Sequence, residues 1–203
     1  MIYLSDVDVV LKLASCGFLP SLPALLGVEE DDLRVGYLVS LKARLSRPGK
    51  RLPDASFQMH LEEFCRRHSV VEASSNHARE QQLLQGGMDP GEAILFAEAE
   101  STRGIVVTGD KRALQAYKAL STPAQRAKIK VVCWEQLLLR VHRVLGFARL
   151  RDGCCAGMSS DKLLALAFSN GLATSEEHAL EALCSYLDGV KAHSADILVR
   201  FDD

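Results

Sequence analysis

The sequence predicts an α/β fold, with a central parallel sheet inside three α/β/α layers and a C-terminal helical hairpin. Short apolar runs typical of buried strands alternate with helical patterns over residues 1–145. Strands separated by helices are joined by right-handed crossovers, which favours parallel pairing. Beyond Gly146 no further strand pattern occurs and two helical segments follow. We therefore divide the chain into a sheet-containing domain at 1–148 and a helical extension at 149–203.

Size and composition fit one hydrophobic core with a small appendage. The chain has 203 residues, of which 48% are hydrophobic and 25% are charged, as is ordinary for a globular protein. No apolar run approaches the roughly 18 to 20 residues that span a bilayer, and no basic stretch precedes an apolar signal core. The six cysteines lack the paired short spacings of a zinc site. We expect a cytoplasmic protein with no membrane partner.

The first third of the chain predicts a strand at 2–6 and a helix that Gly17 ends, since apolar residues first run together and then recur at helical spacing. A short apolar segment follows at 22–26. Residues 35–45 are predicted as a helix, with a strand beginning near Leu33 as the alternative. Proline and glycine predict a surface loop at 46–56.

The middle of the chain alternates regularly between segments with helical periodicity and short apolar segments typical of strands. Apolar residues at helical spacing, ended by glycine or by the next strand, predict the helices, and short β-branched runs predict the strands. The predicted helices are 57–67, 76–85, 89–102, 111–120 and 134–145. The predicted strands are 68–73, 105–108 and 130–133.

The extension opens with a segment at 149–160 that is rich in glycine, cysteine and charge, and that we interpret as a loop. Ser159 or Ser160 can cap a helix at 161–169 that Gly171 would end. Thr174, followed three residues later by Glu177, matches a capping box for a helix at 175–190.

Three acids are predicted to lie at the edge of the sheet formed by the carboxyl ends of its strands. Asp6 and Asp110 each close a predicted strand, and Glu92, eighteen residues before Asp110, opens the helix that leads into the second strand. Open α/β sheets bind ligands at this edge. Clustered carboxylates repel one another and persist when a cation such as Mg²⁺ or Mn²⁺ compensates them. The alternative is that Asp6 and Asp110 simply cap helices and Glu92 favours a helix dipole.

Three stretches containing these acids resemble PIN-domain nucleases, including the VapC-like toxins of bacterial toxin–antitoxin pairs. They are Leu4 to Val10, Asp89 to Ala97, and Val106 to Leu114, in which Thr108 stands two residues before Asp110. The resemblance implies a metal-dependent ribonuclease in which Asp6, Glu92 and Asp110 are catalytic and bind one or two Mg²⁺ or Mn²⁺ ions. It also implies that Thr108, Lys111 and Arg112 assist substrate binding, although the two cations could equally be ordinary helix-surface charges.

The resemblance is incomplete in one respect. PIN nucleases usually supply another acid from the region matching 37–45, where this chain has Ser40 and no Asp or Glu nearby. Asp8, which stands where the family usually has Asn, or Asp89 could replace it as a metal ligand. The further candidates on the following helix are Glu62 and Glu63. The alternative function is a PIN-like module that has lost catalysis and serves as a binding or scaffold module.

Charge is unevenly distributed along the chain. Residues 103–151 carry eleven Lys or Arg against two acids, whereas residues 152–203 carry nine acids against three basic residues. A basic stretch suits a nucleic acid, here RNA, while an antitoxin or other protein and a second copy of the chain are further possible partners. The acidic tail could restrict access to the basic face or dock a partner. Alternatively, it merely covers an apolar patch.

Overall fold

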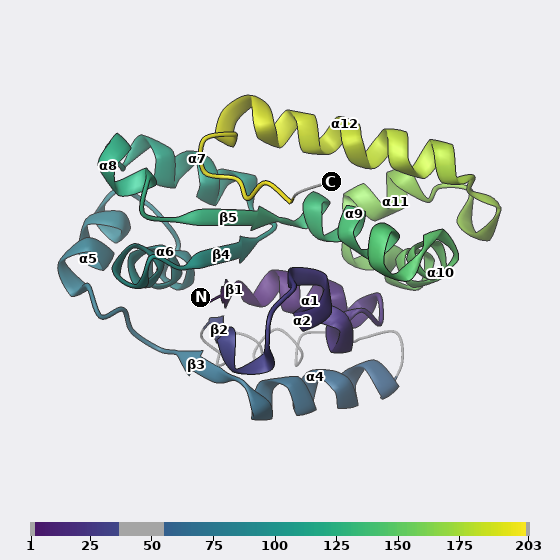
Figure 1. The fold of residues 1–203 in the computed structure, drawn as a ribbon, viewed down its shortest axis with the longest axis horizontal. Coiled ribbons are helices and arrows are strands. Elements are labelled where there is room, and N and C mark those ends of the chain that lie inside the picture. Colours follow the sequence, from purple (N-terminus) through teal and green to yellow (C-terminus); the bar gives the residue numbers. More distant parts are fainter. Residues whose placement is uncertain (1–2, 37–54, 202–203) are drawn as a thin grey trace.

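A computed structural model describes residues 3–36 and 55–201, with side chains from 6–36 and 58–201. The fold is mixed α/β and mostly helical, and its strands form one parallel sheet of order β3-β2-β1-β4-β5 (Figure 1). The strands are β1 (Tyr3–Ser5), β2 (Leu33–Gly36), β3 (Ser69–Val71), β4 (Ile105–Thr108) and β5 (Lys130–Cys133). The predicted α/β class and parallel pairing are confirmed.

Helices connect and follow the strands. Their bounds are α1 (Val7–Ser15), α2 (Leu22–Leu26), α4 (Ala55–Arg67), α5 (His77–Gln85), α6 (Pro90–Thr102), α7 (Lys111–Ala119), α8 (Pro123–Arg126), α9 (Trp134–Leu145), α10 (Phe147–Gly157), α11 (Lys162–Ala167) and α12 (Glu176–Ser194). Short 3₁₀ helices lie at Leu19–Ser21, Glu30–Asp32, Met158–Ser160 and Gly171–Ala173. Across the described ranges no single helix is long and apolar enough to cross a membrane, and a helix pair bent by 115°, Val7–Ser15 with Leu19–Leu26, passes that test by length and composition only.

The order of the strands creates a switch point between β1 and β4. From β1 the chain moves outward to β2 and β3, and then returns to the other side of β1 to add β4 and β5. Ser5 at the end of β1 is in register with Val35 on one side and with Val107 on the other. The carboxyl ends of β1 and β4 therefore lie side by side, which is the position where open α/β sheets form ligand crevices.

The predicted helix at 35–45 is wrong at its start, where the alternative strand is correct. Val35 lies in β2, pairs with Ser5 and Val70, and is completely buried. Because pairing on both sides buries the β-branched Val35, the sheet overrides the helical pattern. The remainder of that prediction, and residues 46–54 of the predicted loop, lie outside the described residues, and α4 begins at Ala55.

The segment at 149–160, expected as a loop, is mostly the helix α10. A Cβ at Gly153 would collide with the Phe18 ring and the Cys16 carbonyl, and one at Gly157 would collide with the Cys16 thiol. The two glycines thus let α10 lie directly against the end of α1 and the segment after it. This tertiary packing outweighs the low helix propensity of glycine. The local pattern, which reflects propensity alone, therefore predicted a loop.

Two helix caps also differ from the prediction by one or two positions. Asp161, and not Ser159 or Ser160, caps α11, with its carboxylate accepting from the N–H groups of Leu163 and Leu164 at 2.8 and 3.4 Å. Ser175 caps α12 in place of Thr174, since its hydroxyl accepts from the His178 N–H at 3.3 Å. Both are good cap residues with extended backbone, and several neighbouring residues offered the same chemistry.

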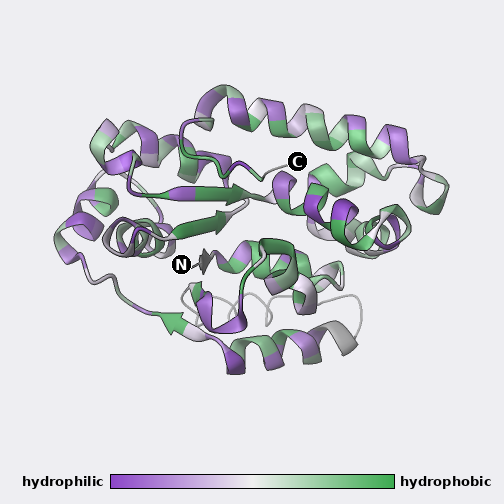
Figure 2. Ribbon diagram, in the orientation of Figure 1, coloured by the Kyte–Doolittle hydropathy of each residue, from purple (hydrophilic) through white to green (hydrophobic). Residues whose placement is uncertain are grey.

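Buried residues form two hydrophobic clusters that divide the strands by alternate positions. In β4 and β5, Val107 and Val132 belong to one cluster, whereas Val106 and Val131 belong to the other. Successive side chains of a strand point to opposite faces, so both faces of this part of the sheet are covered. Figure 2 shows these strands as almost continuously hydrophobic, as expected for strands buried on both faces.

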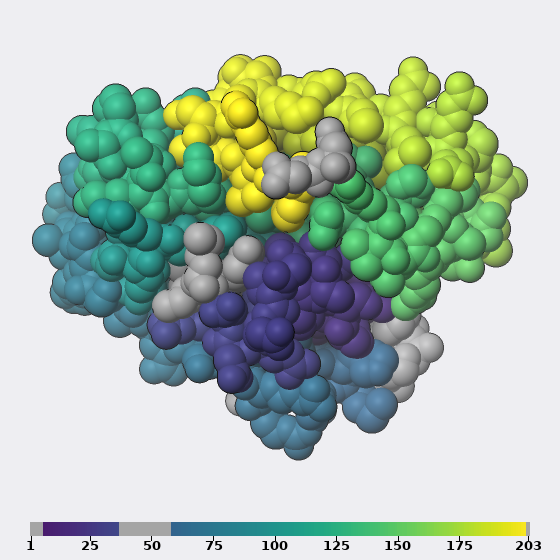
Figure 3. Space-filling model, in the orientation of Figure 1, coloured from purple at the N-terminus to yellow at the C-terminus, as the bar shows by residue number. Residues whose placement is uncertain are grey.

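Residues beyond 149 contribute to both clusters, and α11 packs against α12. The segment after α12 pairs with the edge of β5: Val131 donates to the Ile197 carbonyl and Val199 donates to the Val131 carbonyl, each at 2.8 Å. Asp196 accepts from Lys118 and Arg126 at 2.7 and 3.0 Å, and Figure 3 shows the yellow C-terminal segment lying against the teal surface. The tail both covers apolar surface and pairs with the basic stretch.

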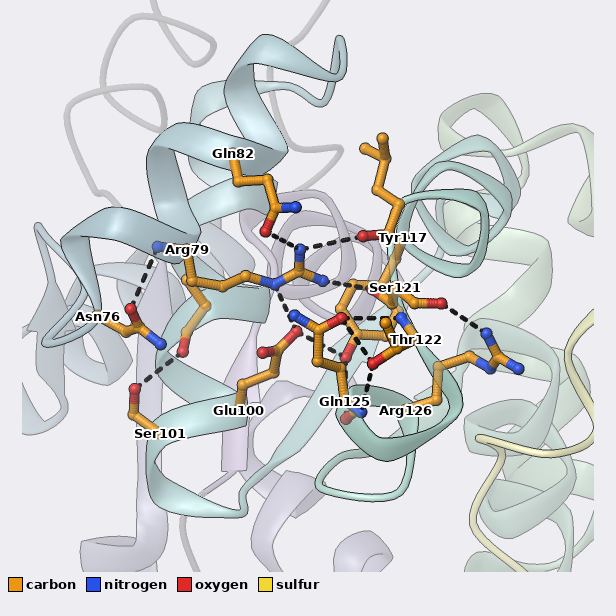
Figure 4. Close-up of polar contacts among 12 residues, drawn as sticks. Asn76, Arg79, Gln82, Glu100, Ser101, Tyr117, Ser121, Thr122, Gln125 and Arg126 are labelled. Carbon is orange, nitrogen blue, oxygen red and sulfur yellow. Dashed lines mark hydrogen bonds and ion pairs between the residues drawn. The ribbon is translucent and has the colours of Figure 1, made fainter.

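A buried polar network around one ion pair joins α5 to α6 and α7, the two helices that carry Glu92 and Arg112. Arg79 of α5 is 4% exposed, and its Nε donates to Glu100 of α6 at 2.8 Å. The Tyr117 hydroxyl of α7 donates to the same carboxylate at 3.0 Å, and the Arg79 guanidinium also bonds Gln82 and Ser121. Figure 4 shows these side chains converging on the guanidinium. The ion pair thus ties α5 to α6, and the Tyr117 hydroxyl ties α7 to α6.

We expect Glu100→Ala to lower the free energy of unfolding by about 3–5 kcal/mol, because it leaves the Arg79 charge buried without its partner. Urea unfolding measures the change. Asp152→Asn is the matched control, since Asp152 pairs with Arg151 at the surface, and it should cost less than about 0.5 kcal/mol. Equal unfolding midpoints for Glu100→Ala and the control would contradict a stabilising role for this pair.

Candidate functional site

A cleft of about 520 Å³ lies where α1, α6 and α7 begin. Five acids line it, together with one arginine and several small or apolar residues. The acids are Asp6, Asp8, Asp89, Glu92 and Asp110, and the arginine is Arg112. All five residues predicted as metal ligands therefore line the same cleft.

Asp6 is held at the junction of β1 and α1. Its backbone N–H donates to the Val107 carbonyl at 2.9 Å, which extends the pairing of β1 with β4 by one residue. Its carboxylate caps α1 and accepts from the Asp8 N–H at 3.4 Å. The alternative interpretation, that Asp6 caps a helix, is confirmed, and capping fixes the carboxylate beside the end of β4.

Asp110 occupies the equivalent position after β4. Its Oδ1 caps α7 by accepting from the N–H groups of Arg112 and Ala113 at 2.7 and 3.3 Å. The hydroxyl of Thr108, which is 1% exposed, accepts from the Asp110 N–H at 3.1 Å. Thr108 thus holds the turn that presents Asp110, and it is not among the residues that line the cleft.

Glu92 and Asp89 come from the first turn of α6. Asp89 caps the helix and accepts from the Gly91 N–H at 2.9 Å, which leaves Glu92 one turn into the helix. Burial raises the pKa of Glu92 to about 7, and the charges of Asp110, Asp6 and Asp89 add to this effect, opposed by Arg112. The raised pKa of Glu92 therefore reflects its burial first and the crowding of negative charge in the cleft second.

The two predicted phosphate-binding cations are placed differently. Arg112 lines the cleft, its side chain is 91% exposed, and its guanidinium lies 3.4 Å from Asp110 Oδ2. Lys111 instead lies 3.0 Å from Glu135 of α9 and above the Tyr186 ring of α12. Arg112 is therefore the cation at the cleft, whereas Lys111 joins α7 to the helices beside it.

Lys12 and Asp161 are residues near the cleft that sequence reasoning missed. Lys12 Nζ lies 3.0 Å from Asp8 and 2.8 Å from Asp161, which caps α11. Burial alone would lower the pKa of Lys12, but Asp8 and Asp161 outweigh it, so the pKa is raised. The i, i+4 spacing of Asp8 and Lys12 was a usable signal. No local sequence pattern indicated that Asp161 would be the second partner of Lys12.

The remaining candidates for the additional acid do not reach the cleft. Ser40 lies outside the described residues. Glu62 accepts from Gln58 one turn earlier in α4 at 3.0 Å, and Glu63 lines a separate pocket with Glu30. Among the described acids, only Asp8 and Asp89 can supplement the three that were predicted as catalytic.

The donor chemistry of the cleft suits a hard divalent cation, since its acids offer carboxylate oxygens. In the described part of the chain, however, no three His, Cys, Asp or Glu side chains are arranged to hold a metal ion. Binding an ion would therefore require the carboxylates to turn toward a common point at about 2.0–2.6 Å. Comparisons with known protein families, with curated proteins and with solved structures found no match to this chain.

The raised pKa of Glu92 makes a prediction about stability. A carboxyl whose pKa is higher in the folded state than its ordinary 4.5 is easier to bury when protonated, so stability is lost as pH rises toward 7 and stays lost above it. Glu92→Gln should therefore gain about 1–2 kcal/mol over the wild type between pH 4 and pH 8, with allowance for solvent screening of this half-buried group.

Urea unfolding at both pH values, without added metal, measures this difference. Glu62→Gln is the matched control because Glu62 is an exposed carboxylate on α4. If Glu92→Gln and Glu62→Gln follow the same pH profile relative to the wild type, the pKa of Glu92 is not raised by burial and by the neighbouring carboxylates as described above.

Proposed function

We propose that this protein is a metal-dependent nuclease of the PIN-like type that hydrolyses phosphodiester bonds in RNA. The observation that carries the proposal is the convergence of Asp6, Glu92 and Asp110 in one cleft at the switch point of the sheet. A PIN-like α/β/α arrangement is part of the proposal, and the two clusters on opposite faces of β4 and β5 support it.

Asp6, Glu92 and Asp110 would hold Mg²⁺ or Mn²⁺, with Asp8 and Asp89 as supplementary ligands. A bound cation of this kind lowers the pKa of a water and stabilises the leaving oxygen of a phosphodiester. The helix N-termini of α1 and α7 orient the Asp6 and Asp110 carboxylates before any ligand arrives.

The charge of the cleft accounts for the proposed metal dependence. Five carboxylates face one guanidinium, that of Arg112, among the lining residues, so a phosphate would be repelled. A divalent cation reverses this balance and gives the phosphate a place to bind. Arg112, exposed at the edge of the cleft, is positioned to contact a flanking phosphate as the strand enters.

A PIN-like binding or scaffold module without catalysis is the second candidate. It is favoured by Lys12, whose ammonium already pairs with Asp8. The lack of three acids arranged around a common point in the described residues also favours it. In that case the internal cation would compensate part of the acidic cluster, and no metal would be needed.

We expect the wild type to cleave labelled single-stranded RNA with Mn²⁺, and Asp6→Asn and Asp110→Asn to lose about a hundredfold or more in rate. Removing a ligand oxygen's charge weakens the hold on the cation. Asparagine caps helices as well as aspartate does, so these variants keep the capping role and remove the charge. Asp152→Asn is the surface control. Equal cleavage by all four proteins, or none over a broad RNA panel, would reject the nuclease.

Calorimetric titration with Mn²⁺ separates the two candidates. For the nuclease we expect binding in the micromolar to millimolar range that Asp110→Asn weakens at least tenfold, as for a carboxylate site. The non-catalytic module predicts no binding by the wild type. Lys12→Met gives a further comparison, because loss of the internal cation would strengthen Mn²⁺ binding if the two compete for the carboxylates.

A further inference from the structure

A second cavity, of about 710 Å³, lies between α9, α12 and the segment after α12. Four cationic side chains line it, and they come from all three of these elements. They are Arg140 and Arg143 of α9, Lys191 of α12, and Arg200. No Asp or Glu is among its lining residues in the described part of the chain. Its charge is therefore opposite to that of the carboxylate cleft.

The acids that contact the border of this basic cavity do not cancel its charge. Lys191 pairs with Asp188 at 3.1 Å, and His142 contacts Glu176 at 2.7 Å. Both acids are more than half exposed, and surface pairs of this kind are worth less than about 1 kcal/mol. An incoming anion with several charged oxygens can compete with them.

The basic cavity also has a flat aromatic surface. Phe201 is half-buried, and the Arg140 guanidinium lies 5.0 Å from the centre of its ring. Arg140 Nε donates to the Leu25 carbonyl at 3.0 Å, which fixes the guanidinium in this position. Aromatic rings and guanidinium planes are surfaces on which nucleobases stack.

We propose that the basic cavity binds one nucleotide of a single-stranded RNA. The phosphate would contact Lys191 and Arg200, and the base would lie against Phe201 and Arg140. The inference that the ligand is RNA rests on the proposed function. The inference that it is a nucleotide rests on the cationic side chains and the aromatic ring of the cavity. The basic cavity supplies the affinity for the polyanion that the acidic cleft lacks.

The position of α12 relates the basic cavity to the cleft. Lys111 follows Asp110 directly and contacts Tyr186 of α12, and the next residue of α12, Leu187, lines the basic cavity. One helix thus contacts both the start of α7 and the basic cavity.

The test is fluorescence anisotropy of a short labelled single-stranded RNA in EDTA, so that binding is measured without cleavage. Lys191→Gln with Arg200→Gln should weaken binding roughly tenfold and reduce the slope of log K against log salt by about 0.7, as expected when one single-strand phosphate is no longer neutralised. The control pair Lys128→Gln with Lys162→Gln removes the same charge from exposed positions outside the basic cavity and should stay within about twofold. Equal weakening by both pairs would overturn the proposal.

Two further comparisons identify what is bound. AMP should displace the RNA at lower concentration than inorganic phosphate, and Phe201→Leu should remove this preference while thermal unfolding shows that the variant is folded. Equal displacement by AMP and phosphate would overturn the base contact. Asp110→Asn should bind RNA in EDTA like the wild type. Binding of RNA by a wild type that does not cleave it with Mn²⁺ would count against the nuclease and leave the basic cavity's role intact.

Discussion

Parallel pairing of β1 with β4 is the interaction on which the arrangement of the cleft depends. The Asp6 N–H donates to the Val107 carbonyl, so the end of β1 is bonded to the strand that presents Asp110. Residues more than a hundred positions apart are thereby placed at one edge of the sheet. The helix before β4 then brings Glu92 to the same place, because a parallel crossover returns the chain across the sheet.

Once the strands are paired, local interactions compensate the repulsion between the neighbouring carboxylates. Asp6, Asp89 and Asp110 each accept from backbone N–H groups at the start of a helix, where the helix dipole favours negative charge. Lys12 compensates Asp8. Glu92 caps no helix, and its burial together with the neighbouring carboxylates raises its pKa. The cleft therefore combines fixed carboxylates with one carboxyl that is close to gaining or losing a proton at neutral pH.

The residues beyond 149 support the sheet and its edge in several ways. They fill both hydrophobic clusters, pair with the open side of β5, and supply Asp161 to the buried Lys12. The charge asymmetry of the sequence is partly internal, since Asp196 pairs with two residues of the basic stretch. Other cations of this stretch, on α9, remain gathered in the basic cavity, beside a helix that also contacts the start of α7.

Local sequence patterns predicted β4, β5, α7 and α9 almost to the residue, and they identified the acids that follow the strands. Hydrophobic periodicity and capping residues act over a few positions, so their pattern is visible in the chain. Folding in three dimensions was needed to make 149–157 helical, to place Val35 in a strand, and to pair Lys12 with Asp161 and Arg79 with Glu100. These outcomes depend on contacts between distant segments, and a local pattern carries no information about which distant group will be adjacent.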